Sequence, residues 1–128
     1  MQGKIDRPNI ELSLNSEGLK VTWGPIQGPW GIFNEVMVAN PENVTITEWW
    51  LIVGTKAKLH QPDEDDEPTR GEIVSQSVGA KTEMTIPRYL LPVKQHIFAQ
   101  VIGFFKSRTK TGDEFIEGIY SDKARVKT

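Results

Sequence analysis

Few residues of this sequence have the types and spacing that catalysis or metal binding requires. The two histidines, His60 and His96, are not partners at the spacing of metal ligands. The acidic run Asp63–Glu67 is consecutive, whereas a calcium loop alternates its ligands around a glycine turn. Cysteine is absent, which excludes a disulfide framework, a cysteine-based metal site and a thiol nucleophile. We therefore expect no metal and no cofactor.

The sequence also lacks the pattern of an enzyme active site. No segment combines a nucleophile, a base and a donor group for a developing negative charge, so we expect no enzymatic activity. The basic run "KSRTK" places Lys106, Arg108 and Lys110 on one side of an extended segment. These cations either contact an acidic partner or a phosphate, or they form a solvated strand end.

The composition is that of an ordinary globular domain. The 128 residues are 38% hydrophobic and 25% charged, which suits a single domain spanning residues 1–128. A net charge of −2 and a pI of about 5.7 argue against a nucleic-acid partner. No apolar stretch approaches the ~20 residues of a membrane span, so no membrane partner is expected. The lack of cysteine and of a secretory signal favours an intracellular location, while a secreted or virion protein stays open.

Hydrophobic residues recur at period two in short blocks separated by Gly, Pro, Asn and Asp, which predicts an all-β chain. The blocks are residues 10–14, 19–23, 46–54, 71–78, 82–86, 96–105 and 120–128. Their number and length predict a β-sandwich. Between and before them we expect a linker at 1–7, an apolar insertion at 24–45, a mobile acidic loop at 56–70 and a third long loop at 106–118.

The order of these blocks resembles a fibronectin type III domain. "RPNIELSLNSEGLKVTWGP" is similar to the first two strands of that family, with the buried tryptophan, here Trp23, ending the second. Trp49, Leu51 and Val53 resemble the inward residues of the third strand. "TEMTIPRYLLPVKQHIFAQVIGFF" is similar to the corner that leads into the sixth strand. The resemblance implies a seven-stranded immunoglobulin-like sandwich, with the insertion 24–45 between the second and third strands.

The register of the sixth strand has two possibilities, because the tyrosine that the family has at the preceding corner is absent here. A slip of one residue would exchange core and surface. We expect Ile97, Ala99, Val101 and Gly103 to face inward, because the family favours a small residue near the end of that row.

The stretch "TEWWLIVG" places two tryptophans side by side, and in a strand only one of them can enter the core. With Trp49 inside, an apolar patch forms on the outer face of the third and sixth strands, which are neighbours in this fold. The patch comprises Trp50, Ile52, Phe98, Ile102 and Phe104. Either residues 26–44 of the chain cover the patch, or a partner protein docks on it.

These features predict a non-catalytic protein–protein interaction module that belongs to a larger regulatory protein. The segment "EGLKVTW" is similar to fibronectin type III domains of intracellular transcription and chromatin cofactors, which would place the chain in the nucleus. The alternatives are a spacer of a phage tail or surface fibre, and a carbohydrate-binding module that uses Trp30 and Trp50. No small-molecule ligand is expected. The predicted partner-binding residues are Trp50, Ile52, Phe98, Ile102, Phe104, Lys106, Arg108 and Lys110.

Overall fold

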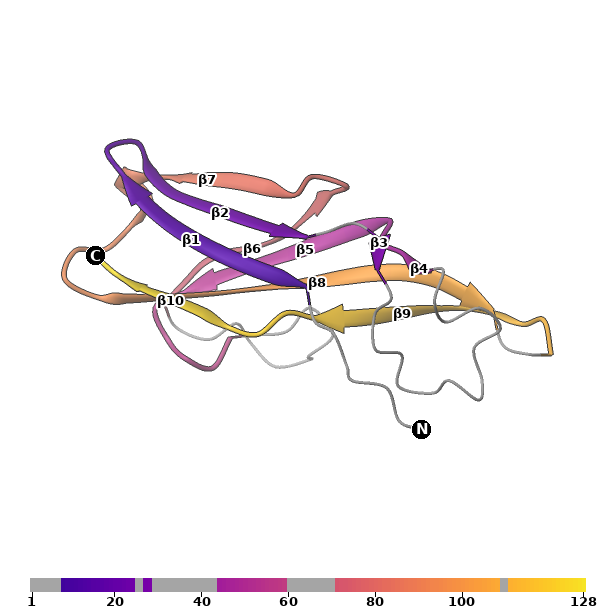
Figure 1. Cartoon of the computed structure of the whole chain (residues 1–128). Coiled ribbons are helices and arrows are strands. Elements are labelled where there is room, and N and C mark those ends of the chain that lie inside the picture. Colours follow the sequence, from indigo (N-terminus) through magenta and orange to yellow (C-terminus); the bar gives the residue numbers. More distant parts are fainter. Residues whose placement is uncertain (1–7, 25–26, 29–43, 60–70, 109–110) are drawn as a thin grey trace.

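The computed structural model describes residues 8–24, 27–28, 44–59, 71–108 and 111–128, and the statements below concern these residues. Two antiparallel sheets pack against each other as a β-sandwich (Figure 1). The smaller sheet has the strand order β1 (Asn9–Asn15), β2 (Gly18–Gly24) and β7 (Glu83–Pro87).

The larger sheet places a long strand at its centre. Its order is β10 (Ala124–Lys127), β8 (His96–Arg108), β5 (Glu48–Gly54) and β6 (Glu72–Gly79), and β9 (Glu114–Tyr120) also pairs with β8. A short ladder joins β3 (Gln27–Gly28) to β4 (Val44–Thr45), and a single 3-10 turn, Arg88–Leu90, follows β7. Among the described residues, no helix has the length and the apolar character that crossing a membrane requires.

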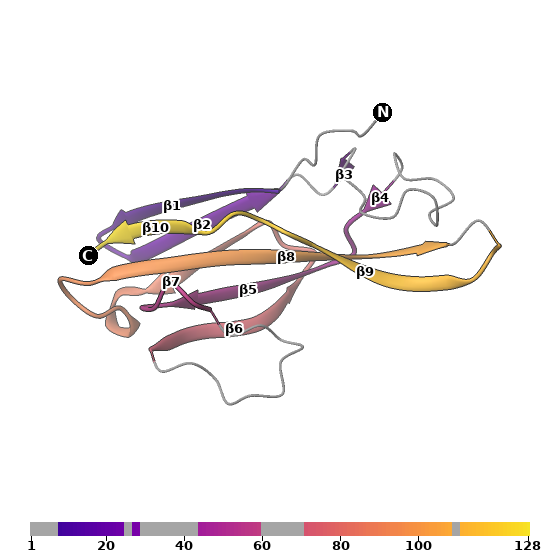
Figure 2. The same ribbon diagram turned by 90° about the horizontal axis from the view of Figure 1, so that it is seen from below.

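Each of the seven predicted blocks contains a strand, but the predicted long loop at 106–118 is wrong. Strand β8 continues to Arg108, and β9 turns back along it with Lys106 opposite Ile116. Gly112, with a φ of 98°, adopts the left-handed conformation that the turn before β9 needs. The hairpin of β8 and β9 extends beyond the smaller sheet (Figure 2). Most of the predicted insertion, residues 29–43, and most of the predicted acidic loop, residues 60–70, lie outside the described residues.

The core between the sheets is built from inward rows of both sheets. Its buried members are Leu19, Val21, Trp23, Ile46, Trp49, Leu51, Val53, Ile86, Ile97, Ala99, Val101, Phe105 and Ile119. Trp23 and Trp49 meet edge to face, with ring centroids 6.4 Å apart and an interplanar angle of 64°. Neither indole N–H has a hydrogen-bond partner among the described residues, so the two rings stabilise the core through packing.

The expected register of the sixth strand is confirmed. Ile97, Ala99 and Val101 of β8 lie in the core with no exposed surface. Gly103 is the small residue near the end of that row, and a Cβ added to it would lie 2.9 Å from both Ile46 Cδ1 and Trp49 Cζ3. The glycine therefore makes room for the Trp49 ring.

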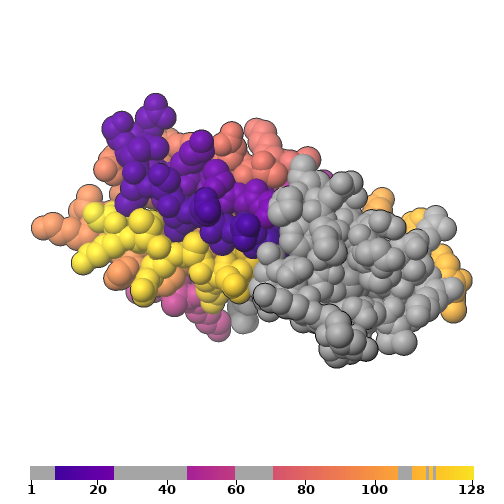
Figure 3. All heavy atoms as spheres, viewed as in Figure 1, coloured from indigo at the N-terminus to yellow at the C-terminus, as the bar shows by residue number. Residues whose placement is uncertain are grey.

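Ser121 holds β8 at the point where that strand changes its partner. β8 pairs with β10 up to Ala99 and with β9 from Ile102 onward. Between these ladders the Ser121 hydroxyl accepts the Val101 N–H at 3.0 Å, and the Ser121 N–H donates to the Val101 carbonyl at 2.9 Å. Beyond this point β10 lies beside β1 on the surface and closes one edge of the sandwich (Figure 3).

The substitution Trp49→Ala should lower the free energy of unfolding by about 3–5 kcal/mol, because it removes the largest fully buried side chain of the core. Trp49→Phe should cost clearly less, since the indole N–H makes no hydrogen bond that would be lost. Denaturant unfolding measures both. Glu11→Ala, at an exposed position of β1, is the control and should stay within about 0.5 kcal/mol of the parent. A midpoint for Trp49→Ala equal to that of the control would contradict the core assignment.

Candidate functional site

The outer face of the larger sheet carries a second apolar cluster, which we call the outer cluster. Ile52, Leu59 and Ile102 are its buried members. Four half-buried aromatic residues pack against them: Trp50, Phe98, Phe104 and Tyr120. The cluster therefore contains all members of the predicted patch, together with two residues that the sequence did not indicate.

Pairing between neighbouring strands brings these side chains together. Trp50 on β5 lies opposite Ile102 on β8, and Ile102 lies opposite Tyr120 on β9. Directly opposed residues of an antiparallel pair share a face, so the three side chains form a row across the sheet. The outer cluster thus spans three adjacent strands.

Gly118 lets the Phe104 ring lie against β9. The two residues are directly opposed, and a Cβ added to Gly118 would lie 3.3 Å from Phe104 Cε1 and 3.2 Å from Ile102 Cγ2. A Cβ at this position would require the ring to shift by a few tenths of an ångström. Gly118 therefore helps to fix the ring of Phe104 on the outer face.

Trp50 is held by a polar contact as well as by packing. Its indole N–H donates to the Ser75 hydroxyl of β6 at 3.0 Å. The hydrogen bond and the packing against the buried members of the outer cluster fix the orientation of the ring, which remains partly exposed. One edge of this aromatic residue is thus available on the surface.

A groove of about 460 Å³ opens beside the outer cluster, where β5 begins and the hairpin of β8 and β9 extends. It is lined by the apolar residues Trp50, Phe104, Phe105 and Ile116 and by the polar residues Thr47, Glu48 and Lys106. Ile116 is 67% exposed, so its side chain adds to the apolar surface that is open to solvent here. The groove therefore offers an apolar floor with one exposed charge of each sign, Glu48 and Lys106.

Thr47 ties the start of this region to β8. Its N–H donates to the Phe104 carbonyl at 2.9 Å, and its hydroxyl lies 3.3 Å from the same oxygen. The hydroxyl group is thus engaged with the backbone, and the groove wall at Thr47 is fixed in place.

The structure brings only part of the predicted site together. Lys106 lies in the groove beside the aromatic residues, Arg108 is the last residue of β8, and Lys110 lies outside the described residues. Ile52 and Ile102 have no exposed surface, so they support the face from below. The binding role of the predicted set stays a prediction.

The other polar candidates do not assemble into a site in the described part of the chain. His96 is exposed and its ring lies 6.4 Å from that of Phe98, while His60 and Asp63–Glu67 lie outside the described residues. Within residues that the structure describes, no three acidic or histidine side chains are grouped so as to hold a metal ion.

Sequence reasoning missed Leu59, Tyr120 and Ile116. Leu59 is 5% exposed although it stands in the polar run "TKAKLH" within a segment predicted to be a mobile loop. Ile116 stands in the predicted loop 106–118, and Tyr120 was placed at the start of the last predicted strand, whereas both belong to β9. The alternation in "EFIEGIY", after the turn signal Gly112, was the pattern that indicates this strand.

Comparisons of the chain with protein-family models, with curated proteins and with solved structures found no match. The functional argument therefore depends on the geometry of the outer face.

In the segment between β5 and β6, we expect Leu59 to be needed for stability and residues 60–68 to be replaceable. Leu59→Ala should lower the free energy of unfolding by about 2–4 kcal/mol, because Leu59 is buried against Ile52 and Ile102. Replacing residues 60–68 with a Gly/Ser linker of equal length should cost less than about 1 kcal/mol. The hydrogen bond from Thr55 N–H to the Gly71 carbonyl, at 3.0 Å, still closes the base of the segment.

Both variants are measured by denaturant unfolding, with Lys58→Ala, at the exposed neighbouring position, as the matched control. A large stability loss in the linker variant, or none in Leu59→Ala, would contradict this division.

Proposed function

We propose that this chain is a non-catalytic protein–protein interaction module that docks its partner in the groove beside the outer cluster. The observation that carries the proposal is the groove itself, in which Trp50, Phe104 and the exposed Ile116 form one apolar surface. Aromatic side chains at the centre of a docking surface supply much of the binding energy in protein complexes. The partner contributes an apolar side chain to the groove, flanked by a basic and an acidic group that face Glu48 and Lys106.

We also propose that the module has a fibronectin type III-like fold, and the strand order supports this. The third and sixth predicted strands, β5 and β8, are neighbours, and the two sheets have the orders β1-β2-β7 and β10-β8-β5-β6. Trp23, near the end of β2, is buried and packs edge to face on Trp49 of β5, which is compatible with this proposal. The missing corner tyrosine and the additional strand β9 are departures from the pattern that this resemblance implied.

The chemistry of the groove favours binding over catalysis. Its lining has one carboxyl group, from Glu48, and the hydroxyl of Thr47 is directed to the Phe104 carbonyl. A spacer domain would not need an exposed isoleucine beside aromatic residues, because such a patch promotes association. A carbohydrate-binding module is less well supported, since Trp50 is half-buried and its N–H is bound to Ser75. In line with the resemblance, we place the module in an intracellular regulator of transcription or chromatin.

The substitution Ile116→Asp tests the groove with little effect on folding, because this side chain is mostly exposed. The affinity for the partner, measured by capture from cell extract, should fall at least about thirtyfold, because a central contact worth about 2 kcal/mol is lost. The unfolding midpoint should stay close to that of the parent. Thr85→Asp adds the same charge at an exposed position of β7, in the other sheet, and should capture the partner normally. Equal capture by both variants would reject the groove as the docking surface.

A further inference from the structure

The turn that joins β7 to β8 exposes an unusual concentration of apolar side chains. Among the described residues, four large hydrophobic residues are exposed, and three of them, Tyr89 at 85%, Leu90 at 46% and Val93 at 78%, lie in this turn. The fourth, Ile116, belongs to the groove described above. We call residues 88–94 the basic tip, because Arg88 and Lys94 are its first and last residues and both are exposed.

The backbone of the basic tip is held in place although its side chains are exposed. The Arg88 N–H donates to the Glu17 carbonyl at 3.1 Å, and the Leu91 N–H donates to the Arg88 carbonyl at 3.0 Å. Leu91 packs on the core, and the Thr128 hydroxyl donates to the Pro92 carbonyl at 2.7 Å. A turn anchored from both sides presents its side chains at little entropic cost on binding.

The backbone at Lys94 adopts an uncommon conformation. Its φ of 55° lies in the left-handed region, which few residues other than glycine adopt. The carbonyl and N–H of the next residue, Gln95, are both bound to Thr128, at 2.8 and 3.1 Å. The surrounding hydrogen bonds thus keep the unusual conformation that brings Val93 and Lys94 to the surface.

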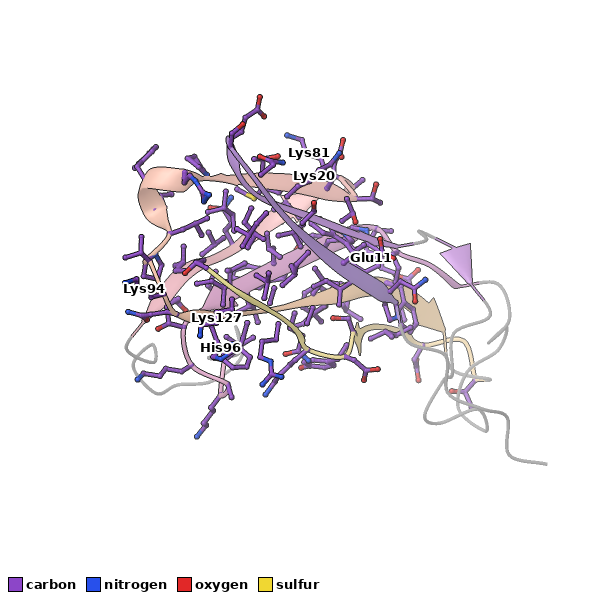
Figure 4. The ribbon with its side chains drawn as sticks, turned by 60° about the vertical axis from the view of Figure 1, so that its left-hand side comes forward. Glu11, Lys20, Lys81, Lys94, His96 and Lys127 are labelled. Atoms are coloured by element: carbon purple, nitrogen blue, oxygen red, sulfur yellow. The ribbon has the colours of Figure 1, made fainter. Side chains whose placement is uncertain are left out.

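The charge around the basic tip is positive although the whole chain carries −2. Lys127 is exposed on β10 opposite His96, close to Lys94, and these residues gather at one end of the molecule (Figure 4). The neighbouring turn between β1 and β2 contributes one acidic residue, Glu17. The cations at this end are Arg88, Lys94 and Lys127. Lys20, opposite Thr85 on β7, is paired with Glu83 at 3.3 Å.

We infer that the basic tip is a docking surface for an anionic phospholipid bilayer. The exposed tyrosine, leucine and valine enter the boundary between headgroups and acyl chains, and Arg88, Lys94 and Lys127 contact the headgroup phosphates and carboxylates. A bilayer accepts projecting apolar side chains without a matching pocket, and Tyr89 has the apolar ring and polar hydroxyl that suit the interface. The absence of a ~20-residue apolar span argues against crossing a membrane, and surface contact needs no such span. The inference does not depend on the groove or on its proposed partner.

Sedimentation of the full chain with phospholipid vesicles tests this inference. With vesicles of phosphatidylcholine and about 30% phosphatidylserine, the parent should sediment at low salt and bind more weakly as salt rises from about 50 to about 500 mM. With phosphatidylcholine alone it should bind at least about tenfold more weakly.

Two variants separate the charged and the apolar contributions. Lys94→Asn removes one charge and keeps a residue that tolerates a positive φ, and it should weaken binding about fivefold. Tyr89→Ser combined with Val93→Ser should weaken binding at least about tenfold at every salt concentration.

The matched controls are Lys81→Asn, at the other end of β7, and Ile116→Ser, in the groove, and both should bind as the parent does. Unfolding curves verify that all variants are folded. A parent chain that stays in the supernatant with phosphatidylserine vesicles would overturn the inference and favour an acidic protein surface as the partner of the tip. Equal loss in Lys81→Asn and Lys94→Asn, or unchanged binding of the Ser variant, would overturn it as well.

Discussion

Strand β8 buries apolar side chains on both of its faces, and the rest of the structure depends on this arrangement. Val101 has no exposed surface in the core between the sheets, and the next residue, Ile102, has none in the outer cluster. The strand pairs with β5 along one edge and with β9 and β10 along the other. Because side chains alternate across a strand, a slip of one residue would exchange the two clusters and leave both badly packed.

In the function that we propose, the division of β8 into two faces also separates stability from binding. Trp49 and Gly103 fit each other on the inner face, whereas Trp50 and Phe104 project from the outer face. The hairpin of β8 and β9 then carries the outer face past the smaller sheet, where Ile116 is exposed beside the groove. Residues beneath the outer face, such as Ile102, are fully buried and stabilise the sheet, and we propose that the residues at its surface contact the partner.

Much of the fold was predictable from sequence, because alternation of apolar and polar residues reports directly on strand faces. Alternation showed that Trp49 and Trp50 lie on opposite faces of their strand. It left two registers open for β8, and the resemblance to fibronectin type III domains was needed to choose the inward row that the structure has. Most of strand β9 was missed because it stands in the segment 106–118, which was assigned to a loop, although "EFIEGIY" alternates. Leu59 was missed for a different reason: a single apolar residue among lysines has no periodicity, and only the fold brings it onto Ile52. From sequence, residues 88–94 were interpreted only as the corner before the sixth strand. The exposure of Tyr89 and Val93 depends on how the backbone turns there, which the sequence pattern does not show.

The most direct test of this account is thiol labelling along β8, because the chain has no cysteine and each single-cysteine variant reports one position. Ala99→Cys and Val101→Cys change side-chain volume little and lie on the inner face, and Lys106→Cys lies on the exposed outer face. In the folded chain we expect Cys at 106 to react nearly as fast as in denaturant. At 99 and 101 the reaction should be at least about a hundredfold slower, because it requires opening of the sandwich. Rapid labelling at 99 and 101 in a folded chain would contradict the register of β8, and with it the division into a core face and an outer face.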